Sequence, residues 1–218
     1  MYHSGFYMKV RFPQYLNRFP PHILYRSSLI SPIFISLTQM LIDKDRIYIA
    51  LYARGGAPTM INKEDMYHWA LLIGPKIENE KAKGTRFHVK ERLVATGQRQ
   101  WFYDELPVSL HATNMLLVRV KIGKILDNKR LRKVLRNCPI RQGEQDWNCV
   151  SWVKEALEAL WRNEKVLGTA ITDWDKVRDG AMSFCQRKID QHRFDGKGNF
   201  DMKMPPTLCL LEGKELIP

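Results

Sequence analysis

The sequence predicts one α+β domain over residues 45–218, because strand-like segments come first and amphipathic helical segments follow them. A hydrophobic fraction of 44% and a charged fraction of 27% are typical of a globular protein. A chain of 218 residues is long enough for one domain with a sizeable core, and no internal repeat divides it.

Residues 1–44 differ from the rest and are predicted to form a poorly ordered N-terminal appendage. They are rich in aromatic residues, Pro and Ser, and contain no acid before Asp43. The apolar stretch "LISPIFISLTQMLI" is broken by Pro32 and Thr38, so it is too short and too polar for a membrane span. The arrangement is not that of a signal peptide, and an organellar targeting segment is the alternative.

Five segments between residues 46 and 123 are predicted to be strands. "RIYIALYAR" begins at Arg46 and is ended by Gly55 and Gly56, and "YHWALLIG" is closed by Gly74 and Pro75. "TRFHVKERLVA" forms a hairpin with "YHWALLIG" across a long polar loop. "RQWFYDEL" and "MLLVRVKIG" are the last two segments of this kind.

Three helices are predicted after the strands: "NKRLRKVLRN", "CVSWVKEALEALWRN" and "DWDKVRDGAMSFCQRKIDQH". The second has apolar residues at three- and four-residue spacing, which gives it one apolar face. The third starts at Asp173, a good capping residue. "PPTLCLL" is expected to be a last strand or an extended tail.

The net charge of +12 is spread along the chain and is densest at residues 128–141. Such a patch indicates an anionic partner or peripheral contact with a membrane surface, and the alternative is the solvated face of a helix. Nucleic-acid binding is not expected, because charge sets no specificity and no RNA-recognition signature is present. The candidate anion-binding residues are Arg130, Arg132, Lys133 and Arg136.

The four cysteines show neither CxxC pairing nor the spacing of zinc ligands, so we expect no disulfide framework and no metal. A reducing, cytoplasmic environment fits this pattern. Cys149 starts the second predicted helix, where Asp146 or Asn148 can act as the cap. Exposed amides and the helix dipole lower the pKa of a thiol at that place. The alternative is a small buried residue of the core.

Two of the six histidines, His68 and His88, lie inside the two strands of the predicted hairpin. If the turn centres near residue 78, they come opposite one another, and their imidazoles share a site. Both are therefore candidates for the base that a thiolate nucleophile requires.

The motifs "YHWALLIG", "FHV" and "NCVSWV" resemble the circularly permuted NlpC-like, papain-like cysteine enzymes, in particular the lecithin retinol acyltransferase-like group. The resemblance covers residues 46–165 and implies a papain-like fold, an antiparallel sheet packed against helices. It implies that Cys149 is the nucleophile, His68 the general base and His88 the residue that orients the base. Two departures are a longer segment between the histidines and "VSW" after the cysteine. The "ALYARGG" strand also resembles uncharacterised small proteins of filamentous fungi.

The function implied is a thiol-dependent hydrolase or acyltransferase that acts on an amide, ester or thioester of an acyl- or peptide-type substrate, without a cofactor. The backbone N–H of Cys149 is an expected oxyanion donor. Further oxyanion or pocket candidates are Gln145, Asn148, Trp147 and Trp69, although both tryptophans would serve equally as core residues. The alternative function is a catalytically inactive protein of the same fold that binds a partner through its basic helix.

Overall fold

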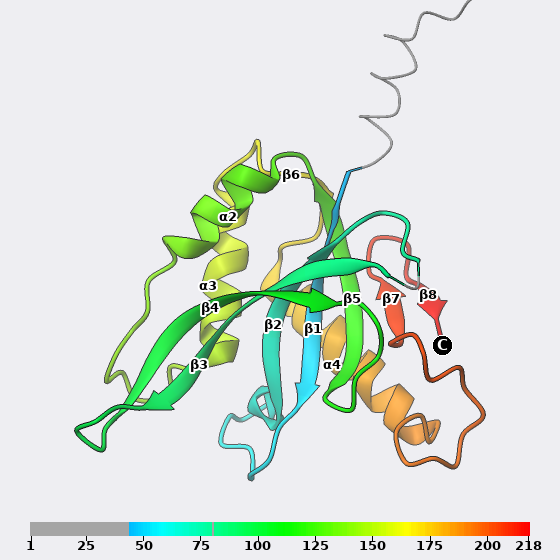
Figure 1. The fold of residues 1–218 in the computed structure, drawn as a ribbon, viewed down its shortest axis with the longest axis horizontal. Helices are drawn as coiled ribbons and strands as arrows, with labels where there is room; N and C mark the ends of the chain where they lie inside the picture. The colour runs from blue at the N-terminus through cyan, green and yellow to red at the C-terminus, as the bar shows by residue number, and fades with distance from the viewer. Residues whose placement is uncertain (1–43, 80) are drawn as a thin grey trace, which may run out of the picture.

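The computed structural model describes residues 44–79 and 81–218. Eight strands form one sheet in the order β4-β3-β2-β1-β5-β7-β8, with β6 paired to β5 (Figure 1). The predicted α+β class is confirmed for this part of the chain. The predicted appendage, residues 1–44, lies outside the described residues except for Lys44.

The predicted strands are present within a few residues of their expected bounds. The strands are β1 (Arg46–Ala53), β2 (Tyr67–Gly74), β3 (Lys83–Leu93), β4 (Arg99–Ser109), β5 (Leu116–Ile125), β6 (Leu167–Ala170), β7 (Thr207–Cys209) and β8 (Lys214–Ile217). Two short ones, β6 and β8, and a 3-10 turn at Glu64–Met66 were not predicted.

The expectation of an antiparallel sheet is wrong for one pair of strands. β7 runs parallel to β5, whereas the other pairs are antiparallel, so the sheet is mixed. The chain between β5 and β7 contains three helices and β6. A connection of that length allows the chain to return in the same direction.

The helices are α2 (Asn128–Arg136), α3 (Cys149–Trp161) and α4 (Trp174–Asp190). Each starts at a side chain that accepts a backbone N–H, as sequence patterns at helix starts predict: Asp127 for α2, Asn148 for α3 and Asp173 for α4. No helix in residues 44–79 and 81–218 combines the length and apolar character needed to cross a bilayer.

The main core lies between the sheet and the helices, where α3 packs against β2 and α4 against β5. A smaller core covers the opposite face of β1 and β2 and contains Tyr48, Tyr52, Ala70, Leu72 and Leu110. In Figure 1 the long β3–β4 hairpin crosses β2 and β1 at a steep angle. The two sides of β2 therefore face two separate apolar clusters.

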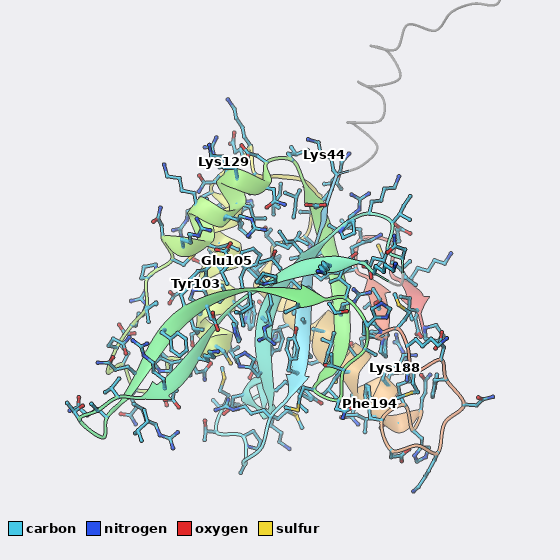
Figure 2. All side chains as sticks on the ribbon, viewed as in Figure 1. Lys44, Tyr103, Glu105, Lys129, Lys188 and Phe194 are labelled. Carbon is cyan, nitrogen blue, oxygen red and sulfur yellow. The ribbon has the colours of Figure 1, made fainter. Side chains whose placement is uncertain are left out.

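Helix α2 is held against the β3–β4 hairpin by charge. Arg132 and Arg136 both bind Glu105 on β4, and the Arg136 Nε to Glu105 Oε2 distance is 2.8 Å. Figure 2 shows Tyr103 and Glu105 on this strand. Burial of Tyr103 and the neighbouring Glu105 carboxylate raise the pKa of the Tyr103 hydroxyl, whereas the two guanidinium groups hold the pKa of Glu105 below its usual value.

Candidate functional site

The two predicted strand histidines are in direct contact. His68 Nε2 lies 2.6 Å from His88 Nδ1, and the rings meet edge to face. The ladder pairs Leu71 with Phe87, so the hairpin turn centres one residue later than residue 78. The histidines are consequently diagonal neighbours on one face of the sheet rather than directly opposite residues.

Burial and nearby cations keep both imidazoles neutral. Burial, followed by Arg86, Arg54 and Lys90, lowers the pKa of His68 to about 4. Burial and the adjacent His68 also lower the pKa of His88, a side chain that is only 4% exposed. At neutral pH one ring therefore donates its N–H to the other ring. One ring nitrogen of the two histidines then keeps a lone pair that this hydrogen bond does not use.

Asp104 continues this chain of polar groups and was not predicted. It lies directly opposite His88 in the β3–β4 ladder, with Asp104 Oδ2 3.7 Å from His88 Nε2. Lys90 binds the same carboxylate at 2.7 Å. His88 Nε2 is buried and has no hydrogen-bond partner among the described residues, so Asp104 is its nearest acidic neighbour.

A signal for Asp104 was present in the sequence. The turn between the "FHV" strand and the "RQWFYDEL" strand contains Gly97, which adopts the left-handed conformation, with φ 79°. A three-residue loop centred on Thr96, with this glycine as its last residue, pairs His88 with Asp104 directly. Counting outward from the turn would have placed the carboxylate beside the second histidine.

Arg86 is a second unpredicted residue of the same face. Its guanidinium lies over the Tyr52 ring at 5.2 Å, and its Nε is buried without a hydrogen-bond partner in the described part of the chain. The Tyr52 ring in turn lies 6.2 Å from that of His68. The histidine pair is thus bordered by an arginine, a lysine and an aspartate rather than by apolar groups alone.

Cys149 is the first residue of α3, as predicted, and Asn148 rather than Asp146 is the cap. Asn148 Oδ1 accepts from the Val150 N–H at 2.8 Å and from the Ser151 N–H at 3.4 Å. The Ser151 hydroxyl oxygen accepts from the Asn148 N–H, which completes a capping box. The local geometry therefore fixes the cysteine in the first turn of α3, beside the N–H groups of the helix start.

The Cys149 thiol is nevertheless protonated at neutral pH. Its side chain is 1% exposed, and burial raises its pKa. Three backbone N–H groups and the charge of Arg54 lower the pKa, but by less than burial raises it. The N–H groups are those of Trp69, Cys149 and Val150. The predicted stabilisation of a thiolate by the helix start is present, but it is the weaker effect.

The structure does not bring Cys149 and His68 into a hydrogen bond within the described residues. Cys149 belongs to the core on the helix side of the sheet, together with Trp69. The His68 ring contacts Tyr52, which belongs to the cluster on the opposite side. The thiol approaches the backbone of Trp69, the residue after His68, so the two predicted partners lie on either side of one short stretch of β2.

The ladder between β2 and β3 is short at this point. It joins residues 71–73 to residues 85–87 and does not reach His68 or Trp69. The sheet is therefore open beside the stretch of β2 that separates the thiol from the imidazole.

The other predicted site residues have structural contacts. Trp69 is fully buried and donates from Nε1 to the Glu64 carbonyl oxygen at 2.7 Å. Trp147 packs edge to face on Trp101 and donates from Nε1 to Glu155. Both tryptophans thus have the core role that was the alternative interpretation. Gln145 is exposed and lines a groove beside the first turn of α3, together with Val150 and Ser151.

The four predicted anion-binding residues divide into two pairs. Arg132 and Arg136 are bound to Glu105, whereas Arg130 and Lys133 line a groove between α2 and α3. In the described residues no group of three His, Cys, Asp or Glu side chains is arranged to hold a metal ion. All four cysteines are free and buried.

Comparison with known proteins shows a family but no activity. The chain belongs to a family of unknown function (DUF6914), whose sequence model matches residues 44–217. No curated protein matches the chain. No solved structure matches it either.

Proposed function

We propose that the chain is a thiol-dependent hydrolase or acyltransferase of papain-like, permuted NlpC-like type, with Cys149 as the nucleophile. The observation that carries the proposal is the contact between His68 and His88 at 2.6 Å, one residue away from the Trp69 backbone that the Cys149 thiol approaches. The proposed nucleophile lies on one side of this segment of β2, and the proposed base and orienting residue lie on the other.

In this proposal His68 is the general base and His88 orients it, with Asp104 behind. His68 Nε2 is occupied by His88, whereas His68 Nδ1 makes no hydrogen bond in the described part of the chain. Nδ1 is therefore the atom that would take the thiol proton. The base must move toward the helix side where the β2–β3 ladder has ended, and catalytic hydrogen bonds often tighten only when substrate binds.

The chemistry would proceed through an acyl-cysteine. His68 takes the proton of Cys149, the sulfur attacks the acyl carbonyl, and the leaving group departs with the proton from His68. Water, an alcohol or an amine then resolves the thioester. The backbone N–H of Cys149, at the first residue of α3, would donate to the oxyanion.

The pKa values of His68 and Cys149 determine when the thiol proton can be transferred. A histidine with a pKa of about 4 is a weak base, and the Cys149 pKa is raised. A stable thiolate–imidazolium pair would therefore not form in the resting protein. Proton transfer must accompany attack on the carbonyl, so we expect slow acylation of activated esters rather than rapid turnover.

Acylation by p-nitrophenyl butyrate tests this function, followed by peptide mapping of the butyrylated residue. We expect the label on Cys149, and we expect no label there in His68→Gln. Cys185→Ser is the matched control, because Cys185 is also a buried helical thiol and should be dispensable. Absence of an acyl group on Cys149, or unchanged acylation in His68→Gln, would overturn the proposal.

A second candidate is an inactive protein of the same fold that acts as a binding factor. The burial of Cys149 and the separation of His68 from it favour this function. It predicts no acyl-cysteine with any activated ester, and binding of an anionic partner that weakens as salt increases.

A further inference from the structure

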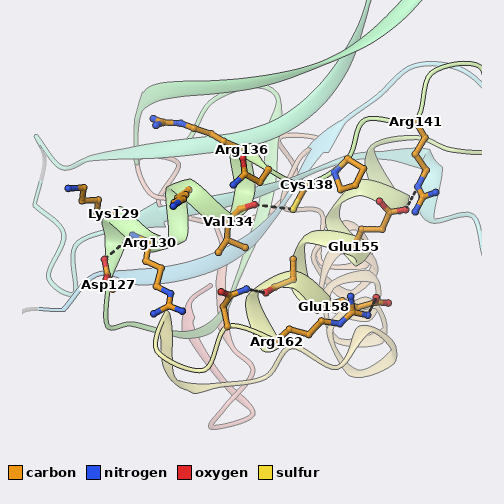
Figure 3. A pocket seen from close by; sticks show the side chains of 15 residues that line it. Asp127, Lys129, Arg130, Val134, Arg136, Cys138, Arg141, Glu155, Glu158 and Arg162 are labelled. Atoms are coloured by element: carbon orange, nitrogen blue, oxygen red, sulfur yellow. Dashed lines mark hydrogen bonds and ion pairs between the residues drawn. The ribbon is translucent and has the colours of Figure 1, made fainter.

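A groove of about 1100 Å³ lies between α2 and α3, away from the histidine pair (Figure 3). Its apolar lining comes from Val134, Cys138 and Ala159, and Figure 3 shows Val134 and Cys138 in contact at its centre. Clefts that hold small ligands usually measure about 300 to 1,000 Å³. The groove slightly exceeds this range, so its volume admits a small molecule without selecting the size of that molecule.

Positive charge dominates the groove. It is lined by six cationic side chains and three acidic ones, which leaves a formal charge of 6 − 3 = +3. The cations are Lys129, Arg130, Lys133, Arg136, Arg141 and Arg162, and the acids are Asp127, Glu155 and Glu158.

Three of these cations already have acidic partners. Arg141 binds Glu155 at 2.9 Å and Arg162 binds Glu158 at 3.3 Å, as the dashed lines in Figure 3 show. Arg136 binds Glu105, which lies outside the groove. Glu155 and Glu158 are therefore paired with arginines. The third acid of the groove, Asp127, accepts a hydrogen bond from the backbone N–H of Arg130.

The remaining three cations are unpaired. The side chains of Lys129, Arg130 and Lys133 are exposed and make no ion pair or hydrogen bond with any described residue. All three project from α2, within five consecutive residues. They are the cations available to a ligand.

Their position is unfavourable for the helix itself. Lys129 and Arg130 lie in the first turn of α2, where the positive end of the helix dipole disfavours cations, and this turn has no acidic residue. Lys129 and Lys133 are four residues apart, a spacing at which like charges repel. An anion in the groove would relieve both conflicts.

The lining also discriminates among anions. No aromatic side chain lines the groove, so it lacks the stacking surfaces that proteins use for unpaired bases. Its hollow shape matches a small anion better than the flat surface of a membrane. We propose that the groove binds a compact polyphosphate anion, free or as part of a small molecule, through Lys129, Arg130 and Lys133.

Calorimetric titration of the full chain with sodium tripolyphosphate tests the site. The triple variant K129Q/R130Q/K133Q should weaken binding by about tenfold or more, because three charge-assisted contacts are lost. The control K83Q/K176Q/K203Q removes the same charge from exposed lysines outside the groove and should weaken binding less than about twofold. Equal losses in both variants would overturn the proposal, and so would no binding at low salt.

Additional ligands identify the source of the phosphates. Equal affinity for ATP and tripolyphosphate would show that the phosphate chain alone is recognised, and tighter ATP binding would show a phosphorylated small molecule. Binding to phosphoinositide vesicles or to a short RNA, with none to tripolyphosphate, would overturn the assignment. The groove variant should fold normally, since the three side chains are exposed and make no ion pair or hydrogen bond with any described residue, and circular dichroism checks this. None of these outcomes depends on Cys149.

Discussion

Cys149 and Cys185 are both buried thiols on helices, but their surroundings differ. Cys185 lies in the middle of α4, and burial raises its pKa to about 11. Cys149 lies at the first residue of α3, where burial is opposed by three backbone N–H groups and by Arg54. Position along a helix therefore gives the Cys149 thiol amide and cationic neighbours that partly oppose burial, although the pKa of both thiols is raised.

Loss of the thiol should produce the largest difference between the two cysteines. Cys149→Ala should reduce the slow turnover of an activated ester to the rate of the uncatalysed reaction, because the proposed acyl intermediate forms on this sulfur. Cys185→Ala should retain turnover per folded molecule. Steady-state kinetics with p-nitrophenyl butyrate measure both, and comparable activity in the two variants would remove the distinction between the cysteines.

The histidine pair beside the Cys149 segment should make stability depend on pH. The folded pKa of His68 is about 4, below the 6.5 of a free histidine, so between these values the unfolded chain binds a proton that the folded chain does not. Stability is then lost as the pH falls through this window. From pH 7 to pH 5, His68 alone should lower the unfolding free energy by about 2 kcal/mol.

Urea unfolding at the two pH values measures this effect. His68→Gln should show a smaller pH dependence than the unaltered chain, while Cys185→Ser should keep it in full. If His68→Gln retains the same pH dependence, the imidazole is not held neutral by its surroundings.

The alkylation rates of the two thiols should differ by a smaller factor. In the proposed enzyme, iodoacetamide should modify Cys149 about tenfold faster than Cys185 at neutral pH, because the amides at the start of α3 and Arg54 partly offset the effect of burial on the Cys149 pKa. Peptide mass spectrometry over time gives both rates in one sample. Equal rates would mean that burial alone controls the two cysteines.

Removal of the helix caps should give the smallest effect. Asn148→Ala and Asp173→Ala each delete one cap, of α3 and α4, and should each cost about 1 kcal/mol of stability. Only Asn148→Ala should also slow the alkylation of Cys149, since it disturbs the turn that holds the thiol. A similar slowing in Asp173→Ala would trace the reactivity to global stability instead.

Much of the fold could be predicted from local sequence patterns. β2 was predicted with its observed bounds, because an apolar run closed by Gly74 and Pro75 has few other conformations. The start of α3 was predicted from a capping residue followed by one apolar face. β6 and β8, at four residues each, become strands only by pairing with β5 and β7, so their own sequences contain little signal.

The candidate site was predicted less completely, for a physical reason. The contact between His68 and His88 follows from strand pairing and could be anticipated. The side of the sheet that they face could not, because both sides of β2 are buried and its sequence shows no polar and apolar alternation. The place of Cys149 relative to His68 depends on how α3 packs across the sheet, which spacing along the chain does not encode.

β3 is also paired unevenly with its two neighbouring strands, β4 and β2. Eleven residue pairs join β3 to β4, whereas three join β3 to β2. Opening the second ladder breaks far fewer backbone hydrogen bonds than opening the first, so residues 85–87 form the weaker of the two junctions of β3. Amide hydrogens that pair β3 with β2 should therefore exchange with solvent before those that pair β3 with β4.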